Sequence, residues 1–201
     1  MIIAPRQPGK KYPEFKTFGE YFYWAYANLN LFEAAIDMGK SKKDKSCYAV
    51  RAKAFKAYKE GRWHIHDLLK NNVAKIQNPN VCWYCSAKVS SPKELTIDHI
   101  IPRSKGGDNS MDNIFMVCKY CNSSKHDMDV LEWFFTKKNQ WPPIEVIAHY
   151  LKQIYNYATT NELMDKALEE VTAMDLPFNP DYFPIDYPHP EEYNNQITNT
   201  I

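Results

Sequence analysis

Apolar residues recur every three or four positions in three parts of the chain. The first part covers residues 15–38 and is rich in aromatic side chains, which predicts one or two helices. The second is a stripe from Val50 to Tyr58, and the third covers residues 144–158. These patterns predict a mostly helical protein.

A different pattern occupies the middle of the chain. Short apolar runs at residues 95–97 and 114–117 predict two strands, and a loop rich in Gly, Ser and charged residues separates them at 103–112. Helical spacing returns after Cys121. The predicted order is therefore strand, loop, strand, helix.

The C-terminal part combines one further helix signal with an irregular tail. Thr159-x-x-Glu162 has the form of a capping box, which predicts a helix that begins at Thr159 and ends near Met174. From Pro177 onward the chain is rich in Pro, Asp, Asn and Tyr. We expect an extended tail whose aromatic side chains wrap on the body, and we expect cleavage chemistry to survive its removal.

Four of the five cysteines form two Cys-x-x-Cys pairs, Cys82 with Cys85 and Cys118 with Cys121. Each pair can present two thiolates from one turn, and two pairs supply the four ligands of a closed tetrahedral zinc site. Two disulfides or four free thiols are the alternatives. Zinc is favoured because the chain has the features of an intracellular protein. Cys47 stands apart and is expected to be a small buried residue.

The net charge of +1 hides an asymmetry along the chain. Residues 1–138 carry 23 Lys and Arg against 14 Asp and Glu, a balance of +9, whereas residues 139–201 carry 2 against 10, a balance of −8. A basic body favours a polyanionic partner. We divide the chain into a basic helical N-terminal region (1–78), a central module (79–138) and a region of acidic helices and extended tail (139–201).

The most basic stretch lies within the N-terminal region, at residues 40–75. Four of its cations surround the apolar stripe of the predicted helix and are candidate contacts to DNA phosphates: Arg51, Lys53, Lys56 and Lys59. The alternative is a solvated helix face, which is the usual meaning of Lys on a helix.

The central segment resembles the HNH nuclease family, whose fold is the ββα-metal (His-Me) finger. The resemblance covers about 45 of the 201 residues, and Asn122 stands where some members carry His. It implies an α+β, mostly helical fold, in which a central ββα-metal module with a structural zinc is flanked by N- and C-terminal helices. The residues that carry the resemblance are Asp98-His99, Ile101-Pro102, Gly106-Gly107, Asn113 and Cys118-x-x-Cys121-Asn122-x-x-Lys125.

The resemblance also implies roles for individual residues. His99 would be the general base, since a neutral imidazole near pH 7 can take a proton from water. Asp98 and Asn122 would hold one catalytic cation, and hard oxygen ligands favour Mg²⁺ or Mn²⁺. Successive strand residues point to opposite faces, so Asp98 and His99 need a strand end or a distorted backbone to share a site.

Five further residues have weaker assignments. Asn113 would brace the loop by bonding to backbone and so hold His99 in line, although in some branches of the family it approaches the metal instead. His126, one helical turn after Asn122, is a candidate second helical ligand, with a surface histidine as the alternative. The remaining candidates, for phosphate contact, are Arg103, Lys105 and Lys125.

The sequence thus predicts a metal-dependent DNA endonuclease of restriction, homing or phage type that leaves 5′-phosphate and 3′-hydroxyl ends. Its expected cofactors are a structural Zn²⁺ and a catalytic Mg²⁺ or Mn²⁺. The expected partner is double-stranded DNA, and a paired cut would require a homodimer. We expect no membrane association and a cytoplasmic location in a prokaryotic or phage-infected cell. The alternative is a non-catalytic, zinc-stabilised module that binds nucleic acid.

Overall fold

The computed structural model describes residues 11–65 and 69–198, so the ends of the predicted N-terminal region and tail lie outside it. The N-terminal part forms two helices, α1 (Phe18–Asp37) and α2 (Lys45–Lys59). Thr17 caps the start of α1, because its hydroxyl accepts a hydrogen bond from the backbone N–H of Glu20. Asp44 caps α2 in the same way by accepting from the backbone N–H of Ser46. One continuous helix therefore accounts for the aromatic pattern at 15–38.

The middle of the chain has the predicted order of elements. After α3 (Leu69–Gln77), β1 (Leu95–His99) pairs antiparallel with β2 (Ile114–Cys118), and α4 (Lys119–Lys125) follows directly. Leu95 lies opposite Cys118, and His99 lies opposite Ile114. Single 3₁₀ turns precede β1 (Pro92–Glu94) and open the loop between the strands (Arg103–Lys105). A short α5 (Val130–Trp133) and a π-helical turn (Phe134–Lys138) complete this part.

The C-terminal part differs from the prediction in two places. The α6 helix (Ile144–Thr160) runs through Thr159, and Glu162 has a left-handed backbone with φ of 56°, so the supposed capping box marks the end of a helix and not its start. The next helix, α7 (Leu168–Thr172), is a short one. The tail is also not fully extended, since it contains a 3₁₀ turn (Pro180–Tyr182) and α8 (Pro190–Thr198).

The tail belongs to the hydrophobic core. Phe183 is fully buried and stacks on Tyr21 with 5.2 Å between ring centroids, and the Tyr21 hydroxyl donates to the backbone oxygen of Pro180 at 2.9 Å. Tyr187 stacks on Phe32 at 4.6 Å. Removal of the tail would therefore uncover part of the core, which argues against the expected survival of cleavage; that expectation stays a prediction.

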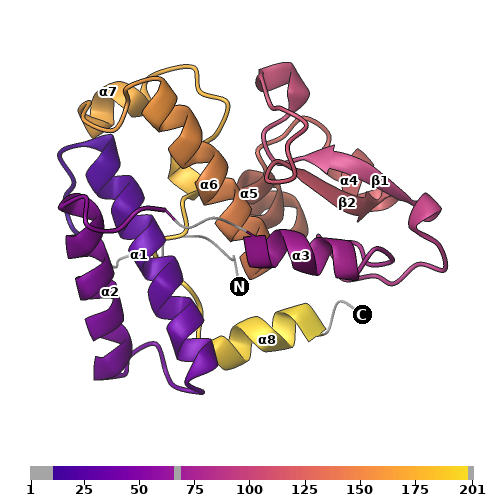
Figure 1. Cartoon of the computed structure of the whole chain (residues 1–201), viewed down its shortest axis with the longest axis horizontal. Coiled ribbons are helices and arrows are strands. Elements are labelled where there is room, and N and C mark those ends of the chain that lie inside the picture. Colours follow the sequence, from indigo (N-terminus) through magenta and orange to yellow (C-terminus); the bar gives the residue numbers. More distant parts are fainter. Residues whose placement is uncertain (1–10, 66–68, 199–201) are drawn as a thin grey trace.

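One hydrophobic core joins all parts of the chain, and it includes Phe22 of α1, Phe115 of β2 and Phe183 of the tail. Figure 1 shows α1 and α2 side by side at one end of the molecule, the β1–β2–α4 unit at the other, and α6 between them. This arrangement confirms the predicted α+β, mostly helical class. Among the described residues, no helix combines the length and apolarity that crossing a membrane requires.

Candidate functional site

The two cysteine pairs come together in the fold. The Sγ atoms of Cys82, Cys85, Cys118 and Cys121 all lie within 4.8 Å of one another, and those of Cys85 and Cys118 are 3.9 Å apart. A tetrahedral zinc–thiolate site places neighbouring sulfur atoms about 3.8 Å apart. All five cysteines are free of disulfides, and Cys47 is buried away from the cluster, as predicted. The four sulfurs therefore fit a structural zinc ion.

Local backbone structure explains how each pair presents its thiols. In the first pair the chain turns back on itself, with Ser86 N donating to Cys82 O at 2.8 Å and Cys82 N donating to Ala87 O at 2.9 Å. In the second pair, Cys118 ends β2 and begins α4, and its Sγ accepts from the backbone of Cys121. The zinc ligands thus join the loop before β1 to the junction of β2 with α4.

The four thiols hold their protons unequally. Hydrogen bonds with Cys121 and then Cys82 lower the pKa of Cys85 to about 3, whereas hydrogen bonds with Cys82 and then Cys85 raise the pKa of Cys121. Lys138 Nζ lies 3.8 Å from Cys121 Sγ and supplies a compensating positive charge. This arrangement suits a divalent cation that replaces the thiol protons.

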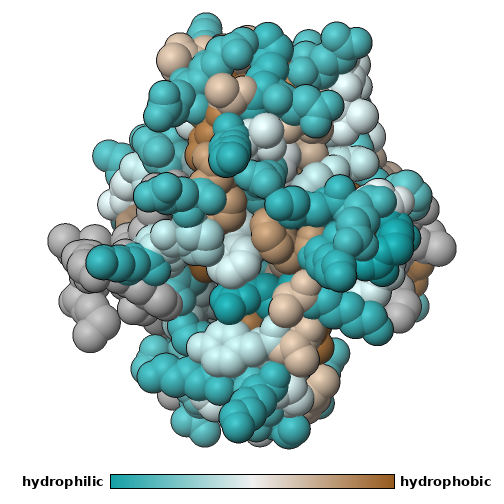
Figure 2. All heavy atoms as spheres, turned by 90° about the vertical axis from the view of Figure 1, so that its left-hand side faces the viewer, coloured by the Kyte–Doolittle hydropathy of each residue, from teal (hydrophilic) through white to brown (hydrophobic). Residues whose placement is uncertain are grey.

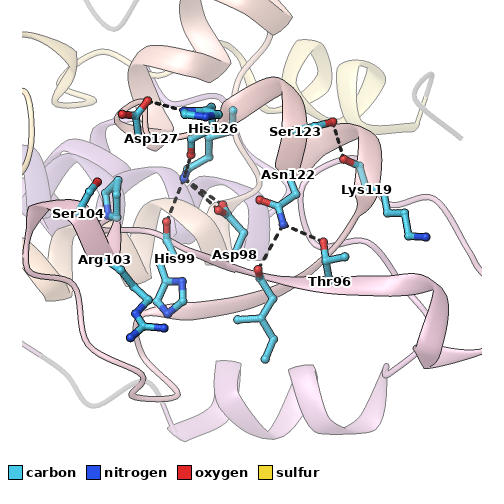
Figure 3. A pocket seen from close by; sticks show the side chains of 13 residues that line it. Thr96, Asp98, His99, Arg103, Ser104, Lys119, Asn122, Ser123, His126 and Asp127 are labelled. Atoms are coloured by element: carbon cyan, nitrogen blue, oxygen red, sulfur yellow. Dashed lines mark hydrogen bonds and ion pairs between the residues drawn. The ribbon is translucent and has the colours of Figure 1, made fainter.

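A cleft of about 540 Å³ runs along the open edge of β1 and the adjoining side of α4. Figure 3 shows its side chains, with the strand residues facing the helix residues across the opening. Lys119 lines the cleft together with six residues that the sequence singled out: Asp98, His99, Arg103, Asn122, Lys125 and His126. The expectation of a strand end is also confirmed, because β1 ends at His99.

Asp98 is held on several sides, with 6 % of its surface exposed. Tyr84 donates its hydroxyl to Asp98 Oδ2 at 2.7 Å, and Lys125 Nζ lies 3.0 Å from Oδ2 and 3.2 Å from Oδ1. Burial raises the pKa of Tyr84 well above its ordinary value, so this hydroxyl keeps its proton and donates. At the cleft, Oδ2 of Asp98 therefore has the shorter hydrogen bond, from Tyr84, and Oδ1 has the longer one, from Lys125.

His99 points away from the carboxylate of Asp98, toward the loop between the strands. Its Nε2 lies 2.9 Å from Asn109 Oδ1, while its backbone oxygen accepts from Lys125 Nζ at 3.0 Å. An amide oxygen only accepts hydrogen bonds, so this contact places the imidazole proton on Nε2 and leaves the lone pair on Nδ1. The ring is thereby oriented with one nitrogen able to take a proton.

Asn122 occupies the middle of α4. Its Nδ2 donates to Thr96 Oγ1 at 2.9 Å and to Ile97 O at 3.3 Å. No donor within the described part of the chain contacts its Oδ1, and Figure 3 shows this oxygen directed toward Asp98. Two hard oxygen atoms thus face one opening, which fits a Mg²⁺ or Mn²⁺ ion that takes its other ligands from water and substrate.

Asn113 is buried and bonds only to backbone. Its Oδ1 accepts from Ile101 N at 2.8 Å, and its Nδ2 donates to Asp108 O at 2.8 Å and Ile101 O at 3.2 Å. A Cβ on Gly107 would lie 1.8 Å from Ile101 O, so this position requires glycine. Asn113 and Gly107 together fold the loop that carries Asn109 back over His99.

Two predicted roles gain no support from the geometry and stay predictions. Lys125 is completely buried and paired with Asp98, so its ammonium group faces the carboxylate and not the solvent. The reason is helical periodicity, because Lys125 shares one face of α4 with Cys121 and that face packs on β1. His126 lies beyond the last turn of α4, with φ of 54°, instead of continuing its face, and its Nδ1 contacts the carboxylate of Asp127 at 2.7 Å.

The wall behind the loop is built by α3 and α6. Lys75 donates to the backbone oxygens of Met111 and Ile114, and Asn72 links His149 at 3.1 Å to Asp112 at 2.6 Å. Burial lowers the pKa of Lys75 to about 8 and that of His149 to about 4. These buried contacts hold the end of the loop next to Asn113.

The predicted DNA-binding residues divide into two groups. Arg103 and Lys105 lie in the loop beside the cleft, and Arg103 lines it. The candidates on α2 lie at the opposite end of the molecule in Figure 1, and Figure 2 shows that end as a largely hydrophilic surface with small apolar areas. Each of these four candidates also has a partner within the chain: Arg51 with Trp24, Lys53 with Trp63, Lys56 with Glu60 and Lys59 with Glu20.

Comparison with known families agrees with this geometry. Residues 82–128 match the family described as HNH endonuclease, and this segment of the chain is therefore an HNH domain. It contains the four cysteines, both strands, α4 and every lining residue of the cleft. Comparisons with curated proteins and with solved structures gave no match.

Proposed function

We propose that the protein is a metal-dependent DNA endonuclease that hydrolyses phosphodiester bonds to 5′-phosphate and 3′-hydroxyl ends. The observation that carries this proposal is the cleft, in which His99, Asp98 and Asn122 meet along one edge of the HNH domain. A base and two oxygen ligands at one opening are the groups that phosphodiester hydrolysis needs.

In the proposed mechanism, His99 accepts a proton from water at Nδ1 while the water oxygen attacks phosphorus. The bond from phosphorus to the 3′ oxygen breaks, and the leaving oxygen takes a proton from solvent. Asn109 holds the imidazole through Nε2, and Asn113 holds the loop that carries Asn109. A divalent cation bound by Asp98 and Asn122 would neutralise charge that develops on the phosphate and leaving oxygen.

The substrate that we propose is double-stranded DNA, because HNH nucleases act on DNA and cations border the cleft. Lys119 lines the cleft on the helix side, and Arg103 lines it on the loop side, so both can meet phosphates of one strand. Cutting both strands at one position would require two copies of the chain, since each copy has one such cleft.

One observation favours the alternative function, a zinc-stabilised module that binds nucleic acid without cutting it. Asp98 already has a buried cation and a hydroxyl as partners, which is also what a purely structural carboxylate would have. The two functions differ in whether Asp98 still binds a metal ion.

Supercoiled plasmid discriminates between them. We expect Mg²⁺ or Mn²⁺ to support nicking or linearisation by the purified protein and EDTA to abolish it, with the structural zinc retained throughout. Sequencing the product ends would give the end chemistry and any target sequence. Binding of plasmid without cleavage at any divalent metal concentration would favour the binding module.

A further inference from the structure

Tyr84 lies inside the first Cys-x-x-Cys pair, between Cys82 and Cys85. Its side chain points away from the four sulfur atoms and contacts Asp98, which lines the cleft. Its ring is 1 % exposed and packs against Trp133 at 5.5 Å and Phe134 at 5.6 Å between centroids. Aromatic contacts on several sides fix the direction of the ring. The hydroxyl at its tip donates to Asp98 Oδ2 at 2.7 Å.

The second cysteine pair reaches the same carboxylate through α4. Lys125 is on the helix that begins at Cys118 and contains Cys121, and its Nζ lies 3.0 Å from Asp98 Oδ2. The same Nζ donates to the backbone oxygen of His99 at 3.0 Å. The segment that carries each cysteine pair therefore also carries one side chain that contacts Asp98: Tyr84 for the first pair and Lys125 for the second.

These contacts distinguish the two oxygens of Asp98. Oδ2 accepts from the Tyr84 hydroxyl at 2.7 Å and lies 3.0 Å from the Lys125 ammonium group. Oδ1 accepts the longer hydrogen bond from Lys125, at 3.2 Å, and keeps a second lone pair. Tyr84 therefore fixes the rotation of the carboxylate through Oδ2 and leaves Oδ1 as the less strongly bonded oxygen for a cation beside Asn122 Oδ1.

We propose that the zinc cluster and the hydrolytic centre are one coupled unit, in which Tyr84 is a positioning residue that turns Asp98 Oδ1 toward the catalytic cation. The proposal rests on the proposed function for its catalytic consequence only, because cation binding can be measured without DNA. Its physical basis is that partners of a metal ligand fix the orientation of that ligand, and their loss typically lowers metal affinity or activity about 10- to 100-fold.

The chain offers a matched control for this idea. Tyr150 is also fully buried, and its hydroxyl donates to a buried carboxylate, Asp129 Oδ2, at 2.6 Å. Asp129 begins α5 and does not line the cleft. Tyr84→Phe and Tyr150→Phe therefore remove the same kind of hydrogen bond, and only the first removes it from a proposed metal ligand.

The experiment compares both variants with the wild-type protein in zinc content, melting temperature and Mn²⁺ binding, the last followed without DNA by the EPR signal of free Mn²⁺. We expect one zinc per chain and similar losses of melting temperature in both variants. We expect Mn²⁺ to bind about 10- to 100-fold more weakly to Tyr84→Phe alone. The Mn²⁺ concentration that gives half-maximal cleavage should rise in parallel, with the rate recovering at high Mn²⁺.

Equal Mn²⁺ affinity in the two variants would overturn the proposal, whether both match the wild type or both fall together. If Tyr84→Phe does not fold, 3-fluorotyrosine at position 84 keeps the ring and hydroxyl but donates more strongly, and unchanged Mn²⁺ affinity would then overturn it. A selective loss of Mn²⁺ binding in a protein that cuts no plasmid would sustain the coupling and refute the nuclease. If the wild type cleaves plasmid but both variants bind Mn²⁺ equally well, the nuclease activity is supported and the coupling is refuted.

Discussion

The HNH domain has two candidate metal sites of opposite character, the cysteine cluster and the cleft along β1. The cluster consists of four like ligands that face one another at close range and satisfy a zinc ion completely. The cleft offers two unlike oxygen ligands, Asp98 and Asn122, and opens to solvent along a strand edge. The first region can only be structural, whereas the second has room for water and a phosphate.

The difference also appears in how each region depends on the rest of the fold. The cysteine ligands need only two tight turns, so local sequence specifies them. The cleft depends on long-range contacts from Tyr84, Lys125 and Asn109, which hold the side chains of Asp98 and His99. A mutation in the cluster should therefore abolish folding, whereas mutations around the cleft should produce graded effects on stability, metal binding and rate.

The largest effect should follow from Cys118→Ser. Loss of one thiolate from a four-ligand site removes binding energy that is also folding energy, on the order of 10 kcal/mol for structural zinc. We expect the variant to lose its zinc by elemental analysis and its cooperative thermal transition. Cys47→Ser is the matched control, since Cys47 is buried outside the cluster and its variant should retain one zinc per chain. Soluble, active wild-type protein without zinc would contradict the assignment.

Lys125→Met should have the next largest effect, on stability. It removes the cation that faces a buried carboxylate, and an uncompensated buried charge costs about 3–5 kcal/mol. Urea denaturation should show this loss, whereas Lys166→Met, which breaks the exposed pair with Glu170, should cost less than about 1 kcal/mol. If the Lys125→Met variant is as stable as the wild type but binds DNA more weakly, the result would support the predicted contact between Lys125 and a phosphate.

The contrast between the two regions explains which features could be predicted from the sequence. Both strands and the zinc ligands are recognisable because short apolar runs and Cys-x-x-Cys spacing are local signals. The direction of Lys125 is also encoded locally, since its spacing from Cys118 and Cys121 places all three on one helix face, but motif resemblance alone assigned it to the substrate. The burial of Lys125 beside Asp98 favours a structural role, and its contact with a phosphate stays a prediction.

Other features have no adequate local signal. Asn109 is one polar residue among several in a loop, and only the folding of that loop by Asn113 brings it to His99. Tyr84 stands in a recognisable place between two zinc ligands, but its bond to Asp98 depends on tertiary packing. The capping-box pattern at Thr159 misled because the same residues occur where α6 ends, and the apolar stripe of that helix outweighed the local preference.

A smaller effect, on pH dependence, should follow from Asn109→Asp. A carboxylate beside Nε2 would stabilise the imidazolium form of His99, so the acidic limb of the pH–rate profile should move to higher pH by about one unit. Asn109→Ala should lower the rate without that displacement. Single-turnover cleavage measured across pH would decide, and an unchanged profile in the Asp variant would show that Asn109 does not control the base.

The central claim is that His99 is the base of a hydrolytic centre, and the most direct measurement is single-turnover plasmid cleavage by His99→Ala together with DNA affinity. The account predicts a rate about 10²- to 10⁴-fold lower, with zinc content, folding and DNA affinity unchanged. His64→Ala, which alters an exposed histidine outside the cleft, should cleave at the wild-type rate. Wild-type cleavage by folded His99→Ala protein, with contaminating nuclease excluded, would contradict the account.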